Sequence, residues 1–112
     1  MNVEIFLSDE FRRQFKRLAK KYKSLVNDFI TFKKELMDDP FQGDELGHGA
    51  RKVRMAIASK GKGKSGGARI ITLNIYKSTA GDIEITLLTI YDKNEISCVT
   101  DDYIKWLISL NH

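Results

Sequence analysis

Lysines and arginines are the residues best suited to chemistry in this chain, and two stretches hold most of them. Residues 12–23 and residues 51–69 each contain seven basic residues and no acidic one, which leaves five bases against all 15 acids elsewhere. The formal net charge of only +4 therefore conceals two strongly basic zones. Such segregation of charge indicates a protein that binds a polyanion.

The second basic zone contains a glycine-rich segment, residues 59–67, whose charges are all positive. Its lysines are Lys60, Lys62 and Lys64. Its four glycines leave the backbone free to follow a ligand, and lysine is costly to bury, so the segment is expected to lie in solvent or on phosphate. A solvated flexible loop is the alternative interpretation.

Cations in strand-like runs flank that segment and favour the phosphate-binding interpretation. Lys52 and Arg54 precede it, and Arg69 opens the run that follows it. Residues two apart in a strand share a face, so Lys52 and Arg54 are predicted to point the same way. The sequence thus predicts that basic residues held on strands lie close to the basic residues of the flexible glycine-rich segment.

Other catalytic patterns are weak. Residues 63–65 (Gly-Lys-Ser) resemble the end of a nucleotide-binding P-loop, but that motif needs a glycine where the chain has Ala58, and a helix that the next two glycines would break. The histidines, His48 in a loop and His112 at the last position, do not suggest a paired-histidine ribonuclease. No CxxC or HExxH spacing occurs, so neither a metal nor a cofactor is expected.

Hydrophobic periodicity predicts the elements that hold the basic zones. Alternation over residues 2–7 predicts a first strand. After Ser8, a good N-cap, apolar residues recur every three or four positions and predict a helix. A second helix is predicted to be capped by Ser24 and to end before Pro40, which makes a helical hairpin. Thr100 is predicted to cap a last helix.

Three β-like runs lie between the helical hairpin and the last helix, at residues 52–57, 69–76 and 83–91. Residues 40–49 are predicted to form a loop, and residues 78–82 a turn. The resulting order is strand, two helices, three strands and a helix. It predicts one α+β domain over residues 1–112, with the helices on one face of a mainly antiparallel sheet.

Length and composition set further bounds. A chain of 112 residues that is 42% hydrophobic can build a single core. No apolar run approaches the roughly 18 residues of a membrane span, and the first residues lack the basic and then apolar pattern of a signal peptide. The lone Cys98 excludes an internal disulfide and fits a reducing compartment. We therefore expect a cytoplasmic protein with no membrane partner.

Several of these residues together resemble a known family. The matching stretches are Arg51-Lys52-Val53-Arg54, then Ala58-Ser59-Lys60-Gly61-Lys62-Gly63-Lys64-Ser65-Gly66-Gly67-Ala68-Arg69-Ile70-Ile71, and then Leu87-Leu88-Thr89-Ile90-Tyr91-Asp92-Lys93-Asn94-Glu95. They are similar to the HigB branch of the RelE/ParE superfamily, the toxins of type II toxin–antitoxin systems. The lysine–glycine segment with its following Gly-Gly-x-Arg is the most specific part of the resemblance.

This resemblance implies a RelE-like fold and an mRNA interferase, an endoribonuclease that cuts a message while it occupies the ribosomal A site. The implied partners are the ribosome, mRNA and a cognate antitoxin, often of the helix-turn-helix type. Lys52 and Arg54 match the paired bases of the family's central strand. Arg69 matches the arginine that opens the next strand, and Lys93 matches the basic residue after the last strand.

One feature of compact RelE toxins, a tyrosine near the chain end, is missing here. Residues 96–99 in that neighbourhood are Ile-Ser-Cys-Val. Tyr91 or Tyr103 would have to replace it, which leaves the identity of the general base open. The loop residues Lys60, Lys62 and Lys64 are expected to bind RNA.

Cleaving RNA through its own 2′-hydroxyl needs removal of that proton, stabilisation of a phosphorane and a proton for the leaving 5′-oxygen. Arg54 and Arg69 are assigned to the phosphorane, because arginine offers a fixed fork of donors to phosphate oxygens. Lys52 and Lys93 are assigned to proton transfer, for which neighbouring positive charges prepare a lysine by lowering its pKa. Tyr91 is expected to stack on a base or to share in proton transfer.

Two other functions stay open at this point. One is a non-enzymatic gyrase inhibitor of the ParE type, which shares the fold but lacks a basic cleavage cluster. The other is a plain RNA- or DNA-binding module, for which segregation of charge alone is sufficient. The bases of the first helix likewise form either its solvated side or a second contact with ribosomal RNA or with an acidic antitoxin; they are Arg12, Arg13, Lys16, Arg17 and Lys20.

Overall fold

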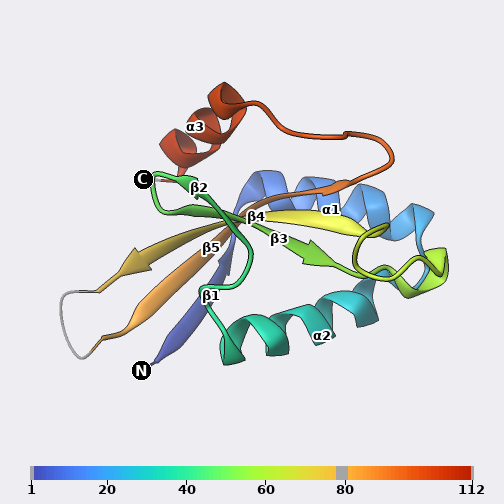
Figure 1. Ribbon diagram of the computed structural model, residues 1–112, viewed down its shortest axis with the longest axis horizontal. Helices are drawn as coiled ribbons and strands as arrows, with labels where there is room; N and C mark the ends of the chain where they lie inside the picture. The colour runs from blue at the N-terminus through green and yellow to red at the C-terminus, as the bar shows by residue number, and fades with distance from the viewer. Residues whose placement is uncertain (1, 78–80, 112) are drawn as a thin grey trace.

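The computed structural model describes residues 2–77 and 81–111 and has an α+β fold (Figure 1). Five strands form one sheet in the order β1-β5-β4-β3-β2. The β1–β5 pairing is parallel and the other three pairings are antiparallel. The prediction of a mainly antiparallel sheet in an α+β domain is confirmed.

The elements follow one another in the predicted order, with two additions. Their bounds are β1 Val3–Leu7, α1 Asp9–Lys21, α2 Leu25–Asp38, β2 Asp44–Gly47, β3 Ala50–Met55, the short 3-10 helix η1 Ala58–Lys60, β4 Ala68–Tyr76, β5 Ile83–Asp92 and α3 Asp101–Leu110. Predicted and observed strand ends differ by at most two residues. Residues 78–80 of the predicted turn lie outside the described residues.

The prediction of a loop throughout residues 40–49 is wrong, because β2 lies within it. This short strand pairs with β3, and Asp44 lies opposite Lys52. The hairpin turns through Gly47, His48 and Gly49, whose φ angles of 87°, 56° and 83° are all in the left-handed region. Glycine takes such angles without strain, which is why two glycines here permit so tight a turn.

Side-chain caps start two of the three helices as predicted. The Ser8 Oγ accepts a hydrogen bond from the Phe11 N–H, and the Thr100 Oγ1 accepts one from the Tyr103 N–H. Ser24 precedes α2 as predicted, but its side chain makes no capping hydrogen bond, so the prediction of a side-chain cap is wrong there. The Ser24 hydroxyl instead accepts from the backbone N–H of Ser59 at 2.9 Å, which ties the start of α2 to η1.

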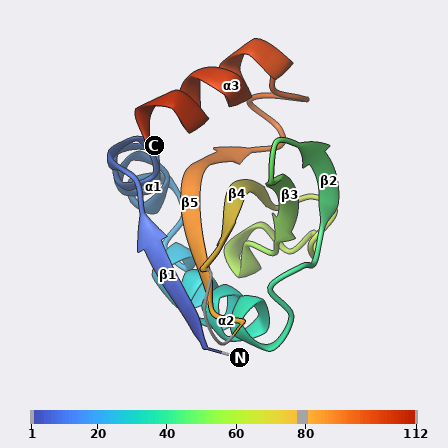
Figure 2. The ribbon, with the colours of Figure 1, turned by 90° about the vertical axis from the view of Figure 1, so that its left-hand side faces the viewer.

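Helices cover both faces of the sheet, so the prediction that they share one face is wrong. One apolar cluster lies between the sheet and helices α1 and α2 and includes Ile70 and Leu87. A second cluster lies between the sheet and α3 and includes Ile71 and Leu88. Figure 2 shows α3 and α2 on opposite sides of the strands. Adjacent apolar residues in β4 and β5 are what strands buried on both faces require.

No helix among residues 2–77 and 81–111 is both long and apolar enough to cross a bilayer.

Candidate nucleic-acid interface

The register of the three central strands aligns the predicted site residues. Arg54 of β3 lies opposite Arg69 of β4, and Arg69 lies opposite Tyr91 of β5. Directly paired residues share a face of a sheet, and so do residues two apart in a strand, which adds Lys52 to this row. We call Lys52, Arg54, Arg69 and Tyr91 the basic row. It lies on the α3 side of the sheet, because Val53 and Ile70, the next pair in register, belong to the opposite cluster.

Lys52 and Arg54 form the accessible part of the basic row. Lys52 is half-buried and Arg54 is exposed. Both line a hollow of about 320 Å³ on the β2–β3 side of the row, together with Gln42, Gly43, Asp44, Val53 and Lys64. Asp44 brings a carboxylate to a place where the sequence suggested only cations. The hollow therefore offers two fixed cations, one lysine from the glycine-rich segment and one carboxylate.

Arg69 differs from Arg54 because it is almost completely buried, with only 6% of its surface exposed. Its Nη1 donates to the carbonyl oxygens of Lys64 and Ala68, and its Nη2 donates to that of Ser65, all at 3.1 Å. Burial and the positive charge of Arg54 lower the pKa of Arg69, although a guanidinium stays charged at neutral pH. Arg69 thus fixes the end of the glycine-rich segment against the sheet.

Tyr91 closes the row on the β5 side and is also buried. Within the described residues its hydroxyl has no hydrogen-bond partner, and burial raises its pKa. Tyr91 also lines a second hollow of about 430 Å³ between α1, the end of β5 and α3. The other tyrosine considered, Tyr103, lines that hollow and donates a hydrogen bond to Glu10. A tyrosine with a raised pKa keeps its proton at neutral pH and gives it up less readily, so the structure does not strengthen the expectation that Tyr91 takes part in proton transfer.

Lys60 is not placed as the sequence suggested. Its ammonium group donates to the Asp92 carboxylate at 2.8 Å, and only 6% of its side chain is exposed. The expectation that every lysine of the segment lies in solvent or on phosphate is therefore wrong for Lys60. Lys62 and Lys64 are exposed, and Lys64 makes a solvent-exposed ion pair with Glu35 of α2.

Asp92 is the centre of a buried polar cluster that sequence reasoning missed. Its side chain is fully buried and accepts hydrogen bonds from Lys60, from the Tyr22 hydroxyl and from the Asn94 backbone N–H. Burial alone would raise the pKa of Asp92, but these bonds outweigh it and lower the pKa to about 2. The ammonium of Lys60 also lies 5.4 Å from the Tyr22 ring centre. This cluster fastens η1, at the start of the glycine-rich segment, to β5 and α1.

Lys93 directly follows β5 and is exposed. Its backbone N–H donates to the Gly67 carbonyl oxygen at 3.3 Å, which holds it beside the start of β4. Its ammonium group makes no hydrogen bond or ion pair with any of the residues described. Lys93 is therefore close in the fold to the residues that lead into Arg69, but it does not line the hollow beside Arg54.

The basic zone of α1 is partly neutralised by the protein itself. Arg13 pairs with Glu10, and both Arg17 and Lys21 pair with Glu95. These contacts explain how so dense a run of bases is tolerated on one helix. They also tie α1 to the segment that follows β5. Lys16 and Lys20 remain exposed.

Among the described residues, no group of three or more His, Cys, Asp and Glu side chains is placed to hold a metal ion. No known protein-family model matches the chain. The function must therefore be argued from the basic row and the hollow beside it.

Proposed function

We propose that this chain is an RNA-cleaving toxin of the RelE/ParE superfamily, close to the HigB branch, and that it works without a metal ion. The observation that carries the proposal is the register of β3, β4 and β5, which brings Lys52, Arg54, Arg69 and Tyr91 into one row. These are four of the five residues assigned to catalysis from the sequence, and they come from three separate stretches of it.

The roles within the row follow from exposure. Arg54 is exposed, so its guanidinium binds the scissile phosphate and stabilises the phosphorane. Lys52 and the Asp44 carboxylate lie beside it in the same hollow, so the carboxylate accepts the 2′-hydroxyl proton and the Lys52 ammonium group gives a proton to the leaving 5′-oxygen. Arg69 uses three of its donors on backbone carbonyls, so it positions the segment that carries Lys62 and Lys64. Those two lysines bind flanking phosphates.

The proposed setting is the cytoplasm, where the message is bound to the ribosome. The proposed partners are the ribosome, mRNA and a cognate antitoxin. Lys93 keeps the role in proton transfer that was assigned to it from the resemblance to the HigB branch. A gyrase inhibitor of the ParE type is expected to lack a basic cleavage cluster, so the exposed cations around the hollow make that alternative less well supported.

A plain RNA-binding module is the second candidate, and one observation favours it. Arg69 has most of its donors occupied, and the phenol of Tyr91 is buried, so fewer groups than expected can act on a reacting phosphate. Such a module would bind RNA through Lys52, Arg54, Lys62 and Lys64 without cutting it.

Induced expression separates these functions. The chain is expressed alone and together with the small reading frame next to its gene, and message ends are mapped by primer extension. The toxin proposal predicts growth arrest that the neighbour relieves, with cuts within codons of translated messages. Growth arrest with gyrase-dependent DNA breaks would support a ParE-type inhibitor instead. RNA binding with neither arrest nor cuts would support the plain module.

A further inference from the structure

The buried carboxylate of Asp92 lies in sequence between two residues of the proposed site. Tyr91, which precedes it, ends the basic row, and Lys93 follows it directly after β5. Because successive side chains of a strand point to opposite faces, Asp92 points away from the basic row and toward α1, where Tyr22 donates to it. Within the described residues, its hydrogen bonds and ion pairs reach no member of the basic row. Any effect of Asp92 on that row must therefore pass through the segments that Asp92 holds.

One of these is the start of the glycine-rich segment. The Oδ1 of Asp92 accepts from the Lys60 ammonium group at 2.8 Å, and both side chains are buried. Two backbone N–H groups of η1 donate to the side chains of Ser24 and Asp28, which hold η1 against α2. Among the hydrogen bonds and ion pairs of the described residues, the one between Lys60 and Asp92 is what ties η1 to β5.

The other is the turn that carries Lys93. The same Oδ1 of Asp92 accepts from the backbone N–H of Asn94 at 2.9 Å. The backbone carbonyl of Asp92 accepts from Glu95 at 3.0 Å and from Ile96 at 3.1 Å, which closes the turn. A single carboxylate oxygen therefore holds both the start of the glycine-rich segment and the turn after β5.

A buried cation thus fixes each end of the glycine-rich segment. Lys60 binds Asp92 at the start, and Arg69 donates to backbone carbonyls of the segment at the end. Between these two points Lys62 and Lys64 are exposed. Fixing both ends limits where these lysines can lie, so less freedom remains to be lost when they bind a phosphate.

Stability alone does not explain a buried ion pair at this place. Taking two charges out of water is costly, and apolar residues of similar volume often stabilise a fold equally well or better. What the pair of Lys60 and Asp92 adds is a defined geometry between η1 and the end of β5.

We infer that Asp92 is a positioning residue for the proposed RNA cleavage, the function on which this inference rests. By binding Lys60 and the Asn94 N–H with one oxygen atom, it sets where the glycine-rich segment and Lys93 lie relative to the basic row. It also withholds Lys60 from the RNA, which leaves the other two lysines of the segment to contact phosphates.

Two substitutions separate the contacts of Asp92 from its charge. Asp92→Ala and Asp92→Asn each remove one negative charge, but asparagine keeps a side-chain oxygen that can accept from Lys60 and from the Asn94 N–H. Single-turnover cutting of ribosome-bound mRNA is measured at saturating protein, at a temperature where circular dichroism shows each variant folded.

We expect Asp92→Ala to cut about tenfold or more slowly than wild type, because small displacements of reacting groups are costly. Asp92→Asn should keep most of the wild-type rate. RNA affinity should fall in neither variant, since each has lost an acidic residue. A slower maximal rate without weaker binding is the result expected of a positioning residue.

Hydrogen exchange observes the same positions without any cleavage. The backbone N–H groups of Gly61 and Lys93 make hydrogen bonds that do not involve the Asp92 side chain. Both amides should exchange about tenfold faster in Asp92→Ala than in Asp92→Asn. The amide of Ile104 in α3, on the opposite face of the sheet, should exchange at the same rate in both.

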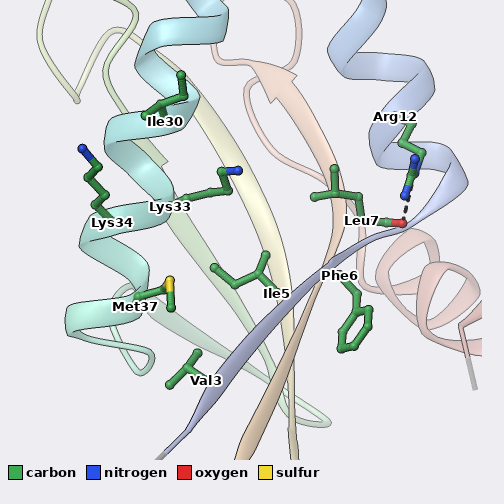
Figure 3. Close-up of a pocket in the computed structure, with 9 residues that line it drawn as sticks. All are labelled: Val3, Ile5, Phe6, Leu7, Arg12, Ile30, Lys33, Lys34 and Met37. Carbon is green, nitrogen blue, oxygen red and sulfur yellow. Dashed lines mark hydrogen bonds between the residues drawn. The ribbon is translucent and has the colours of Figure 1, made fainter.

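A second variant serves if Asp92→Ala does not fold. Lys60→Met combined with Asp92→Asn breaks the same tie and leaves no unpaired buried charge. This double variant should also cut about tenfold or more slowly. Lys33→Met is the matched control, because Lys33 is an exposed lysine of α2 that lines a hollow beside β1 (Figure 3). It lies across the sheet from the basic row, so Lys33→Met should cut at the wild-type rate.

Three outcomes would overturn the inference. They are a folded Asp92→Ala protein that cuts at the wild-type rate, equally slow cutting by Asp92→Ala and Asp92→Asn, and unchanged exchange of the Gly61 and Lys93 amides. A wild-type protein that leaves ribosome-bound message intact would instead overturn the proposed function. The exchange comparison would then still decide whether Asp92 holds the two segments.

Discussion

At the scale of single residues, burial separates two arginines that the sequence presents alike. Arg54 and Arg69 lie opposite each other in the sheet, yet Arg54 is exposed and Arg69 is buried among backbone carbonyls. Their shared face could be predicted from period-two alternation. Their different exposure could not, because it depends on where residues 61–67 fold back.

Stability measurements should separate the two arginines. Arg69→Ala removes three hydrogen bonds from a buried charged group to backbone carbonyls and should lower the free energy of unfolding by roughly 3 kcal/mol. Arg54→Ala should change it by less than about 0.5 kcal/mol. Urea unfolding followed by circular dichroism gives both values. Equal losses for the two variants would contradict the structural role given to Arg69.

The buried Lys60–Asp92 pair makes a second residue-scale prediction. Lys60→Met leaves the Asp92 carboxylate without its closest cation and should cost roughly 3 kcal/mol of unfolding free energy. Lys105→Met, which breaks the exposed pair of Lys105 with Asp101, is the matched control and should cost less than about 0.5 kcal/mol. Thermal and urea unfolding check both variants, and a Lys60→Met protein as stable as the control would contradict the prediction.

The same pair gives a pH dependence. The pKa of Asp92 falls from an ordinary value of 3.8 to about 2 in the folded protein, so its contribution is complete above about pH 4 and is lost as the pH falls toward 2. The full contribution is about 2 kcal/mol. Wild type should therefore lose about that much more stability than Asp92→Asn between about pH 5 and pH 2. Parallel stability curves for the two proteins would show that Asp92 has no lowered pKa.

At the scale of elements, the strands β1, β3, β4 and β5 could be predicted closely from their alternation and apolar runs. β2 could not, since residues 44–47 have one apolar side chain and depend on pairing with β3. The position of Asp44 could not be predicted either. Asp44 lies at the candidate site, opposite Lys52, only because β2 pairs with β3. One signal could have indicated this hairpin, namely the two glycines around His48 at its turn.

The glycines of the segment have different physical roles, which substitution should separate. A Cβ on Gly67 would lie 2.1 Å from the Met55 carbonyl oxygen and 3.0 Å from the Ala56 Cα, so Gly67→Ala forces β3 and β4 apart. It should cost about 3 kcal/mol or more of unfolding free energy. Gly63 has φ of 63° with open space around it, so Gly63→Ala should cost only about 1 kcal/mol. Unfolding experiments that rank the two the other way would contradict this assignment.

At the scale of the whole molecule, the charge segregation visible in the sequence is partly undone by folding. Glu10, Glu95 and Asp92 pair with bases of α1 and with Lys60, whereas Lys52, Arg54 and Lys62 stay available. The site could be predicted as a set of strand positions, but the internal pairing of Lys60 could not. It depends on a contact between residues 32 positions apart. The position of α3 on the opposite face also needed the structure.

RNA binding should therefore depend on salt less steeply than fourteen clustered bases suggest. If Arg54 contacts a phosphate, Arg54→Ala should reduce the slope of log K against log salt by about one. Lys77→Ala should leave the slope unchanged, because Lys77 follows the far end of β4 and pairs with Glu4 and Glu84. Anisotropy titrations of a labelled RNA over a range of salt concentrations give both slopes. An unchanged slope for Arg54→Ala would place the phosphate elsewhere.

The most direct test of the central claim is the rate at which purified protein cuts mRNA bound to ribosomes. Arg54→Ala should keep the wild-type free energy of unfolding and cut about 100-fold or more slowly, because the proposed phosphorane cation is gone. Lys77→Ala should cut at the wild-type rate. A folded Arg54→Ala protein that cuts as fast as wild type would contradict the claim that the basic row is the site of RNA cleavage.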